Sequence, residues 1–107
     1  MNDDLWLKRF KSDALPKLIE NFRPKRVILF GSRIKSTAYE DSDIDVIVVS
    51  DAFINIPFVR RMSLILQLVK FPKHIDYICY SSDEFERIKN KSSILIDAME
   101  HCEDIEL

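Results

Sequence analysis

The chain has a single glycine among its 107 residues, and this glycine directly follows an apolar run. Average usage would give roughly seven glycines in a chain of this length. The run Arg26-Val27-Ile28-Leu29-Phe30 predicts a strand over 26–30, which Gly31 ends. Glycine adopts positive φ without strain and allows another group to approach the backbone closely. We therefore expect the turn after this strand to need one of these properties at Gly31.

Length and composition predict one cytoplasmic domain spanning 1–107. Apolar residues make up 47% of the chain, enough for a substantial core, and the net charge is only −2. Such a balance provides no overall basic field, so we expect no nucleic-acid partner, although a local basic patch is an open alternative. The acidic N-terminus and short apolar runs predict neither a signal peptide nor a membrane span. Cys79 and Cys102 lack metal-ligand spacing and are interpreted as reduced thiols.

The apolar spacing predicts helices that alternate with strands. At the N-terminus it predicts helices over 3–11 and 14–22, because Pro16 argues against one uninterrupted helix. The run over 43–50 is apolar on both faces, which is typical of a central strand. The remaining pattern predicts a short helix over 32–36, a helix over 57–69, a strand over 74–80, a helix capped by Ser82 or Asp83, a helix over 92–101 and an edge strand over 105–107.

Two carboxylates lie at the start of the strongest strand. Asp43 and Asp45 are two residues apart, so a strand places both on one face. Neighbouring carboxylates repel each other, and a divalent cation removes this cost. Mg²⁺ prefers carboxylate and phosphate oxygens. The pair therefore predicts a Mg²⁺ site, with a loop or cap role for Asp43 as the structural alternative.

The turn after the first strand is a candidate anion site. A helix beginning at Ser32 would offer free backbone N–H groups and a hydroxyl to a phosphate, and Gly31 would keep the approach open. Arg33 or Lys35 could add positive charge, or could point to solvent. The alternatives are a simple strand-ending turn at Gly31 and an N-cap role for Ser32.

A third carboxylate occurs in another apolar run, His74-Ile75-Asp76-Tyr77-Ile78. A lone Asp in such a run is costly to bury, and it is explained if Asp76 lies beside the other two. A third carboxylate suits nucleotidyl transfer, where it completes a second metal site or activates the attacking hydroxyl. We interpret His74 and His101 as surface or packing residues. Arg60 and Arg61 are interpreted as part of a solvated helix face, with contact to a partner or nucleotide as the alternative.

Together these motifs resemble a known family. Gly31-Ser32, followed after ten residues by Asp43-Ile44-Asp45, is similar to the signature of the polymerase-β-like nucleotidyltransferase superfamily. The flanking apolar runs and the segment around Asp76 resemble its minimal nucleotidyltransferase (MNT) family. The resemblance covers nearly the whole chain. It implies an α/β (α+β) fold in which a small mixed β-sheet is flanked by helices.

The resemblance also implies an activity and a partner. Asp43, Asp45 and Asp76 would be the catalytic, metal-binding carboxylates for two Mg²⁺ ions, and ATP would be the substrate. Gly31, Ser32 and Arg33 would bind the nucleotide. Many minimal members are encoded together with a HEPN-domain ribonuclease toxin, and in such pairs the MNT protein is the antitoxin and can transfer AMP to a tyrosine of the toxin. We therefore expect such a toxin as partner, in a hetero-oligomer, because these residues include no second domain to hold an acceptor.

One position departs from the family pattern. The family often has a second glycine shortly after Gly-Ser-Arg, where this chain has Ser36, so the turn there is expected to be less permissive. Because all three carboxylates are present, the resemblance still implies an active enzyme. Two alternatives stay open: a non-catalytic binding module that neutralises a toxin by covering its surface, and nucleotidyl transfer to RNA or a small molecule.

Overall fold

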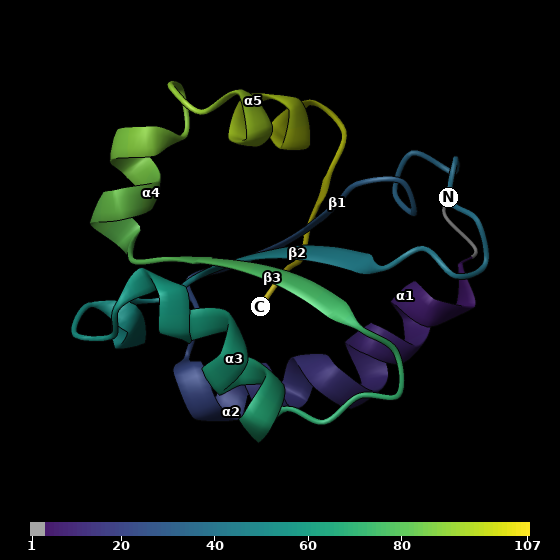
Figure 1. The fold of residues 1–107 in the computed structure, drawn as a ribbon, viewed down its shortest axis with the longest axis horizontal. Helices are drawn as coiled ribbons and strands as arrows, with labels where there is room; N and C mark the ends of the chain where they lie inside the picture. Colours follow the sequence, from purple (N-terminus) through teal and green to yellow (C-terminus); the bar gives the residue numbers. More distant parts are fainter. Residues whose placement is uncertain (1–3) are drawn as a thin grey trace.

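The computed structural model describes residues 4–107 and has a four-stranded sheet at its centre (Figure 1). β1 is antiparallel to both β2 and β4, whereas β2 and β3 run parallel. This small mixed sheet flanked by helices confirms the α+β fold that the sequence predicts. The strands are β1 (Arg26–Phe30), β2 (Ile44–Val49), β3 (Ile75–Tyr80) and β4 (Glu103–Asp104), in the order β3-β2-β1-β4.

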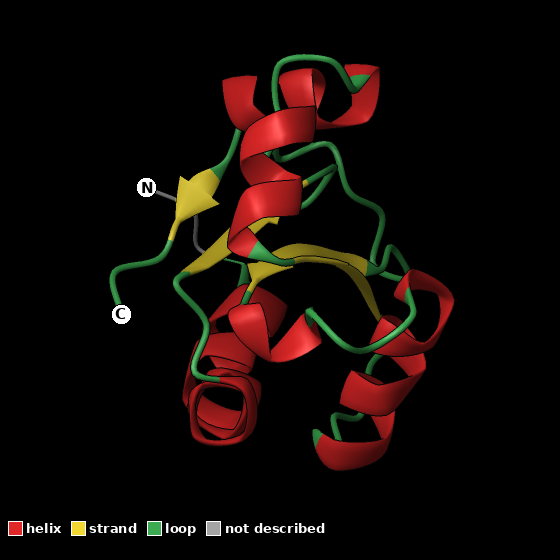
Figure 2. Cartoon of the chain, turned by 90° about the vertical axis from the view of Figure 1, so that its left-hand side faces the viewer, coloured by secondary structure: helices red, strands yellow, loops and turns green. Residues whose placement is uncertain are grey.

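Helices cover both faces of the sheet (Figures 1 and 2). Four helical segments lie on one face: α1 (Leu5–Arg9), the π-helix η1 (Phe10–Ala14), α2 (Leu15–Phe22) and α3 (Phe58–Leu68). The other face carries α4 (Ser82–Ile88) and α5 (Ser93–Glu100), and a short 3₁₀ helix, η2 (Asp51–Phe53), follows β2.

Strand β2 is the centre of the core. Val46 and Val48 pack into the cluster formed with α1, η1, α2 and α3, whereas Ile47 and Val49 pack into the cluster formed with α4 and α5. The strand is therefore buried on both faces, as its continuous apolar run predicts. Burial on both faces also fixes its register, because a slip by one residue would exchange the two sets of side chains.

The N-terminal helices form one continuous helical course, not two separate helices. Position 3, where we expect the first helix to begin, lies outside the described residues. Asp4 caps α1 by accepting from the N–H groups of Trp6 and Leu7. At η1 the N–H of Leu15 donates to the carbonyl of Phe10, five residues earlier. We attribute this wider turn to Pro16, which has no N–H to donate and whose ring crowds the preceding turn of a regular helix.

Three other predicted elements differ from the structure. Residues 32–36 form hydrogen-bonded turns and not a helix. The cap of α4 is Ser81, which forms a capping box with Glu84, and neither Ser82 nor Asp83 has this role. The edge strand is Glu103–Asp104, two residues before the expected 105–107, and Asp104 forms an ion pair of 2.6 Å with Arg26.

β1 has the predicted bounds, and the ends of β2, α3, β3 and α5 lie within one residue of the predicted ones. Across residues 4–107, each helix is too short or too polar to cross a lipid bilayer.

Candidate active site

Two of the predicted carboxylates lie side by side across the sheet. In the parallel pairing of β2 and β3, Asp45 is the register partner of Asp76, and in the antiparallel pairing of β1 and β2 it is the partner of Phe30. Register partners project to the same face of a sheet. This face is the one covered by α4 and α5, since Ile47 and Ile78, two residues further along each strand, both pack there. Asp43 precedes β2 and is exposed.

Gly31 lies directly beneath the Asp45 carboxylate. Its φ is +83°, in the left-handed region. A Cβ added to Gly31 would lie 2.2 Å from Oδ2 of Asp45 and 3.0 Å from its Cγ. Gly31 therefore provides both the positive φ and the close approach expected of it. The turn needs the positive φ, and the Asp45 carboxylate occupies the space that a Cβ would fill.

A tight turn joins Gly31 to the following loop. The carbonyl of Gly31 accepts from the N–H groups of Ile34 and Lys35, at 3.2 and 3.1 Å, and the carbonyl of Ser32 accepts from the N–H of Thr37. The hydroxyl and N–H of Ser32 donate to no group within residues 4–107, which leaves both available to an anion. Ser36 has a φ of +60°, so the position where the family often has glycine does adopt the left-handed conformation here.

The carboxylates form a strongly negative cluster. Burial, followed by the charges of Asp76 and then Asp43, raises the pKa of Asp45 to about 6, and nearby His74 opposes this effect. A carboxylate held in such surroundings is stabilised by a cation. Within residues 4–107, however, no three His, Cys, Asp or Glu side chains are arranged as a ready metal site. The cluster therefore suits a cation whose coordination is completed by other oxygens, such as those of a triphosphate.

Arg33 is placed differently from the sequence expectation. Its side chain is buried, with 6% exposed, and it points into the protein. The guanidinium donates to the carbonyls of Glu40 and Ser42 at 2.7 and 2.9 Å and forms an ion pair of 2.7 Å with Asp4. The structure thus does not bring Arg33 to Asp43, Asp45 and Asp76. The Arg33 side chain instead holds the loop over 37–42 against the start of α1.

Two further charged residues lie near the site. Lys35 forms an ion pair of 3.3 Å with Asp97 of α5, which links the turn to the helix above it. His74, interpreted above as a surface or packing residue, is exposed and is close enough to Asp45 to affect its ionisation. Its spacing of two residues from Asp76, on the same face of the strand, could have indicated this position.

Comparison with known proteins agrees with this geometry. The sequence profile of the nucleotidyltransferase domain matches residues 11–105. The chain belongs to the nucleotidyltransferase domain family. Domains of this family typically use a nucleoside triphosphate and a divalent metal, and they transfer a nucleotidyl group. No curated protein matches the sequence.

A solved structure has a similar fold. It is a protein of Sulfolobus solfataricus, described as a candidate nucleotidyltransferase, and it aligns with a TM-score of 0.58. The two chains are 23% identical over 76% of this chain and 72% of the other. At this level of identity the likeness concerns the nucleotidyltransferase fold alone.

Proposed function

We propose that this nucleotidyltransferase domain transfers AMP from ATP to a tyrosine hydroxyl of a HEPN-domain toxin and thereby acts as its antitoxin. The observation that carries the chemistry is the pairing of Asp45 with Asp76, with Gly31 beneath the Asp45 carboxylate. The antitoxin role and the identity of the partner rest on the sequence resemblance to the MNT family.

The reaction exchanges a phosphoanhydride bond of ATP for a phosphate ester bond to the acceptor. The acceptor oxygen forms a bond to the α-phosphorus of ATP while the bond to the bridging oxygen breaks, and pyrophosphate leaves with the electron pair. The hydroxyl proton passes to a carboxylate. Asp76 is the candidate for this role because it is exposed and lies beside Asp45. The protein contributes chiefly position and charge, as is usual in phosphoryl transfer.

The turn would bind one end of the triphosphate of ATP, and the carboxylates would bind the other. The hydroxyl and N–H of Ser32 would donate to the triphosphate, above a glycine that leaves the approach open. Asp43 and Asp45 would hold Mg²⁺ together with phosphate oxygens, and Asp76 would share a second ion. When bound, Mg²⁺ neutralises the triphosphate charge and lowers the pKa of the attacking hydroxyl.

The acceptor is proposed to be part of another protein because Asp76 faces outward. It lies on β3, the terminal strand of the sheet, and its side chain is exposed. An acceptor hydroxyl can thus approach Asp76 from outside the fold. This openness supports an acceptor supplied by a partner.

The direct test is labelling with [α-³²P]ATP and Mg²⁺, with and without the protein encoded by the neighbouring gene, followed by a denaturing gel. We expect a labelled partner band that is lost in the Asp43→Asn/Asp45→Asn variant. Asp83→Asn, which changes an exposed carboxylate on α4, is the matched control and should label normally. A stable complex without label would refute the proposed transfer.

A specific observation favours a second candidate, a steric antitoxin. Ile54, Phe58 and Val59 expose apolar side chains around the start of α3, with exposed fractions of 62%, 52% and 86%. Apolar side chains gathered in this way are typical of a protein-binding surface. If the Asp43→Asn/Asp45→Asn variant still neutralises the toxin, covering the toxin and not AMP transfer is the mechanism.

A further inference from the structure

We propose that this domain also transfers AMP to its own chain, with the hydroxyl of Tyr39 as the acceptor within the same molecule. Tyr39 lies in the loop that joins the turn after β1 to the start of β2. The transfer of AMP rests on the proposed function, whereas the position of Tyr39 beside the site follows from the contacts of its loop. The site would thus have an acceptor of its own when no partner supplies one.

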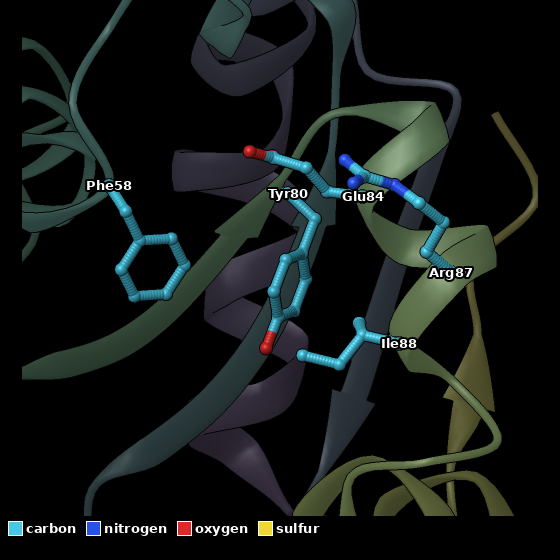
Figure 3. Close-up of a pocket in the computed structure, with 5 residues that line it drawn as sticks. All are labelled: Phe58, Tyr80, Glu84, Arg87 and Ile88. Atoms are coloured by element: carbon cyan, nitrogen blue, oxygen red, sulfur yellow. The ribbon is translucent and has the colours of Figure 1, made fainter.

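Tyr39 differs in exposure from the other two tyrosines of the chain. Its side chain is 81% exposed, and its hydroxyl forms no hydrogen bond within the part of the chain that the structure describes. Tyr77 is buried together with its hydroxyl. Tyr80 is half-buried, and in Figure 3 its ring lies between Phe58 and Ile88, where it lines a cavity of about 480 Å³. Tyr39 is therefore the tyrosine that a substrate in solution reaches most readily.

Hydrogen bonds hold the backbone of Tyr39 close to Asp43. The N–H of Ser42 donates to the carbonyl of Tyr39 at 3.1 Å, and the N–H of Tyr39 donates to the Ser42 hydroxyl at 3.0 Å. A hydrogen-bonded turn of four residues brings its first and last Cα atoms within about 7 Å of each other. Since Asp43 directly follows Ser42, the Cα atoms of Tyr39 and Asp43 lie within about 11 Å of each other. A tyrosine side chain can cover much of this distance.

Two basic residues connect the Tyr39 loop with both halves of the site. Arg33 belongs to the turn that would bind the triphosphate, and its guanidinium donates to the carbonyls of Tyr39 and Glu40, at 3.4 and 2.7 Å. Lys73, which precedes the strand of Asp76, donates to the same Glu40 carbonyl at 3.4 Å. Figure 1 shows this loop at the end of the sheet where β2 and β3 begin. The loop therefore borders both the turn and the strand of the third carboxylate, and Tyr39 lies at the rim of the site.

The loop combines an anchored backbone with an exposed acceptor side chain. The anchor is the buried Arg33 guanidinium, which holds the Tyr39 carbonyl in place while the ring stays in solvent. An acceptor in the same molecule has an effective concentration set by its tether, in the millimolar range even for a short flexible one. Transfer to Tyr39 should therefore occur at a rate that does not depend on protein concentration.

The step uses the same chemistry as the proposed reaction. The phenol oxygen of Tyr39 forms a bond to the α-phosphorus of ATP, the bond to the bridging oxygen breaks, and pyrophosphate leaves with the electron pair. The phenol proton passes to Asp76, the carboxylate proposed above for this role. The product is a phosphodiester that joins Tyr39 to AMP, and it is detected as an added mass on the intact chain.

Mass spectrometry after incubation with ATP and Mg²⁺ tests the transfer. We expect one AMP per chain, on the peptide that contains Tyr39, and at least tenfold less AMP on Tyr39→Phe at equal times. Tyr80→Phe is the matched control, because it also removes one phenol hydroxyl, and it should be labelled like the original chain. Since Tyr39 is exposed, Tyr39→Phe should unfold at the same urea concentration as the original chain. Labelling of Tyr39→Phe at the original rate would overturn the inference.

A mixture of two variants tests whether the transfer stays within one molecule. Tyr39→Phe retains the three carboxylates, whereas Asp43→Asn/Asp45→Asn retains Tyr39 and lacks the carboxylates that would hold the metal. The two chains differ in mass, so a spectrum of the mixture reports on each. We expect neither to be labelled, and we expect the original chain to be labelled at the same fractional rate at low and high concentration. AMP on the Asp43→Asn/Asp45→Asn chain would show transfer between molecules and overturn the inference.

Paramagnetic broadening in proton NMR spectra locates Tyr39 without turnover. Mn²⁺ binds the same oxygen ligands as Mg²⁺, and α,β-methylene-ATP occupies the site without transferring AMP. The ring signals of Tyr39, assigned by their absence in Tyr39→Phe, should broaden at a Mn²⁺ concentration that leaves those of Tyr80 narrow. Tyr80 is the reference because it lies four residues beyond Asp76 along β3, or roughly 13 Å at about 3.3 Å per residue. Equal broadening of the two rings, or broadening of neither, would overturn the placement of Tyr39 at the rim.

A free acceptor separates this inference from the proposed function. N-acetyltyrosinamide has the same phenol hydroxyl without the loop. AMP on N-acetyltyrosinamide or on the partner, with none on Tyr39, would overturn the inference and leave the proposed chemistry intact. AMP on Tyr39 and not on the partner would confirm the inference and refute the partner as acceptor. Absence of AMP on every acceptor would refute the proposed chemistry and self-transfer together.

Discussion

Replacing Gly31 by alanine tests whether the fold reserves this position for the Asp45 carboxylate. The new Cβ would lie 2.2 Å from Oδ2 of Asp45, far inside van der Waals contact. Overpacking of this kind costs about 1–3 kcal/mol. The left-handed φ of +83° adds roughly 1–2 kcal/mol for any L-residue. Alanine also reduces the conformational entropy of the unfolded chain, which offsets up to about 1 kcal/mol of this loss. We therefore expect Gly31→Ala to lower the free energy of unfolding by about 1–5 kcal/mol.

Urea denaturation followed by the fluorescence of Trp6, the only tryptophan, measures this loss. Trp6 packs against the core and meets the Phe71 ring in a T-shaped contact, so unfolding changes its surroundings. A double-mutant cycle with Asp45→Ala separates the two causes. The truncated side chain keeps only its Cβ, at 3.2 Å from the new methyl group. The overpacking cost should largely disappear, while the cost of the left-handed φ should persist.

If Gly31→Ala lowers the free energy of unfolding equally, within about 0.5 kcal/mol, in the original chain and in the Asp45→Ala variant, the steric argument is refuted. Ser36→Gly is the matched substitution of opposite sign, since Ser36 has a φ of +60° without a glycine. It should raise the free energy of unfolding by up to about 1 kcal/mol, because the relief of strain exceeds the entropy gained by the unfolded chain. The same urea titration measures it.

Three further changes test interactions around the site. Arg61→Met should lower the free energy of unfolding by about 3 kcal/mol in urea titration, because losing the buried guanidinium would leave two backbone carbonyls without their donor and Glu84 without its ion pair. The bond from Arg61 lowers the pKa of Glu84 to about 2, so its stabilising effect is complete above pH 4.5 and is lost as the pH falls through about 2. Glu84→Gln should flatten the dependence of stability on pH across this range in acid titrations followed by circular dichroism, and an unchanged profile would contradict the pairing. Arg33→Lys cannot maintain bonds to Asp4, Glu40 and Ser42 together, so hydrogen exchange in the loop over 37–42 should accelerate while that of β2 stays constant.

The sequence was sufficient to predict the strands that carry the site. The alternation around Asp43 and Asp45, and the apolar run around Asp76, depend on strand period and on burial, which are local properties of the chain. The conformation of Gly31 was equally accessible, because few residues can adopt its φ. The register could not be predicted from the sequence. The pairing of Asp45 with Asp76 depends on how β2 and β3, which are joined in the chain through α3, align in the core.

The errors have identifiable physical causes. Pro16 breaks a regular helix, but a π-helical turn accommodates it without ending the helical course. The capping box at Ser81 is visible in the sequence as Ser-Ser-Asp-Glu, a local signal that places the cap one residue before the predicted Ser82. The edge strand was placed on apolar residues, whereas an exposed strand of two residues pairs through its backbone and needs none.

The two buried arginines differ most from what the sequence predicts. Both Arg33 and Arg61 were assigned to solvent or to a ligand, yet each is nearly buried. A planar guanidinium can satisfy several carbonyls at once, and the acceptors lie in loops whose path local pattern does not reveal. A buried arginine is therefore a consequence of tertiary structure and is difficult to predict from a window of neighbouring residues.

The two halves of the site are held by different means, and this difference bears on how it functions. Asp45 and Asp76 project from strands whose register is fixed by apolar packing, so their relative position cannot change without moving the core. The turn over 31–36 is held by backbone bonds, by the buried Arg33 guanidinium with its partners Asp4, Glu40 and Ser42, and by an exposed ion pair from Lys35 to Asp97. Apolar packing thus positions the carboxylates and a buried arginine positions the turn, so in the proposed reaction the triphosphate and the acceptor would meet a geometry that the fold has already set.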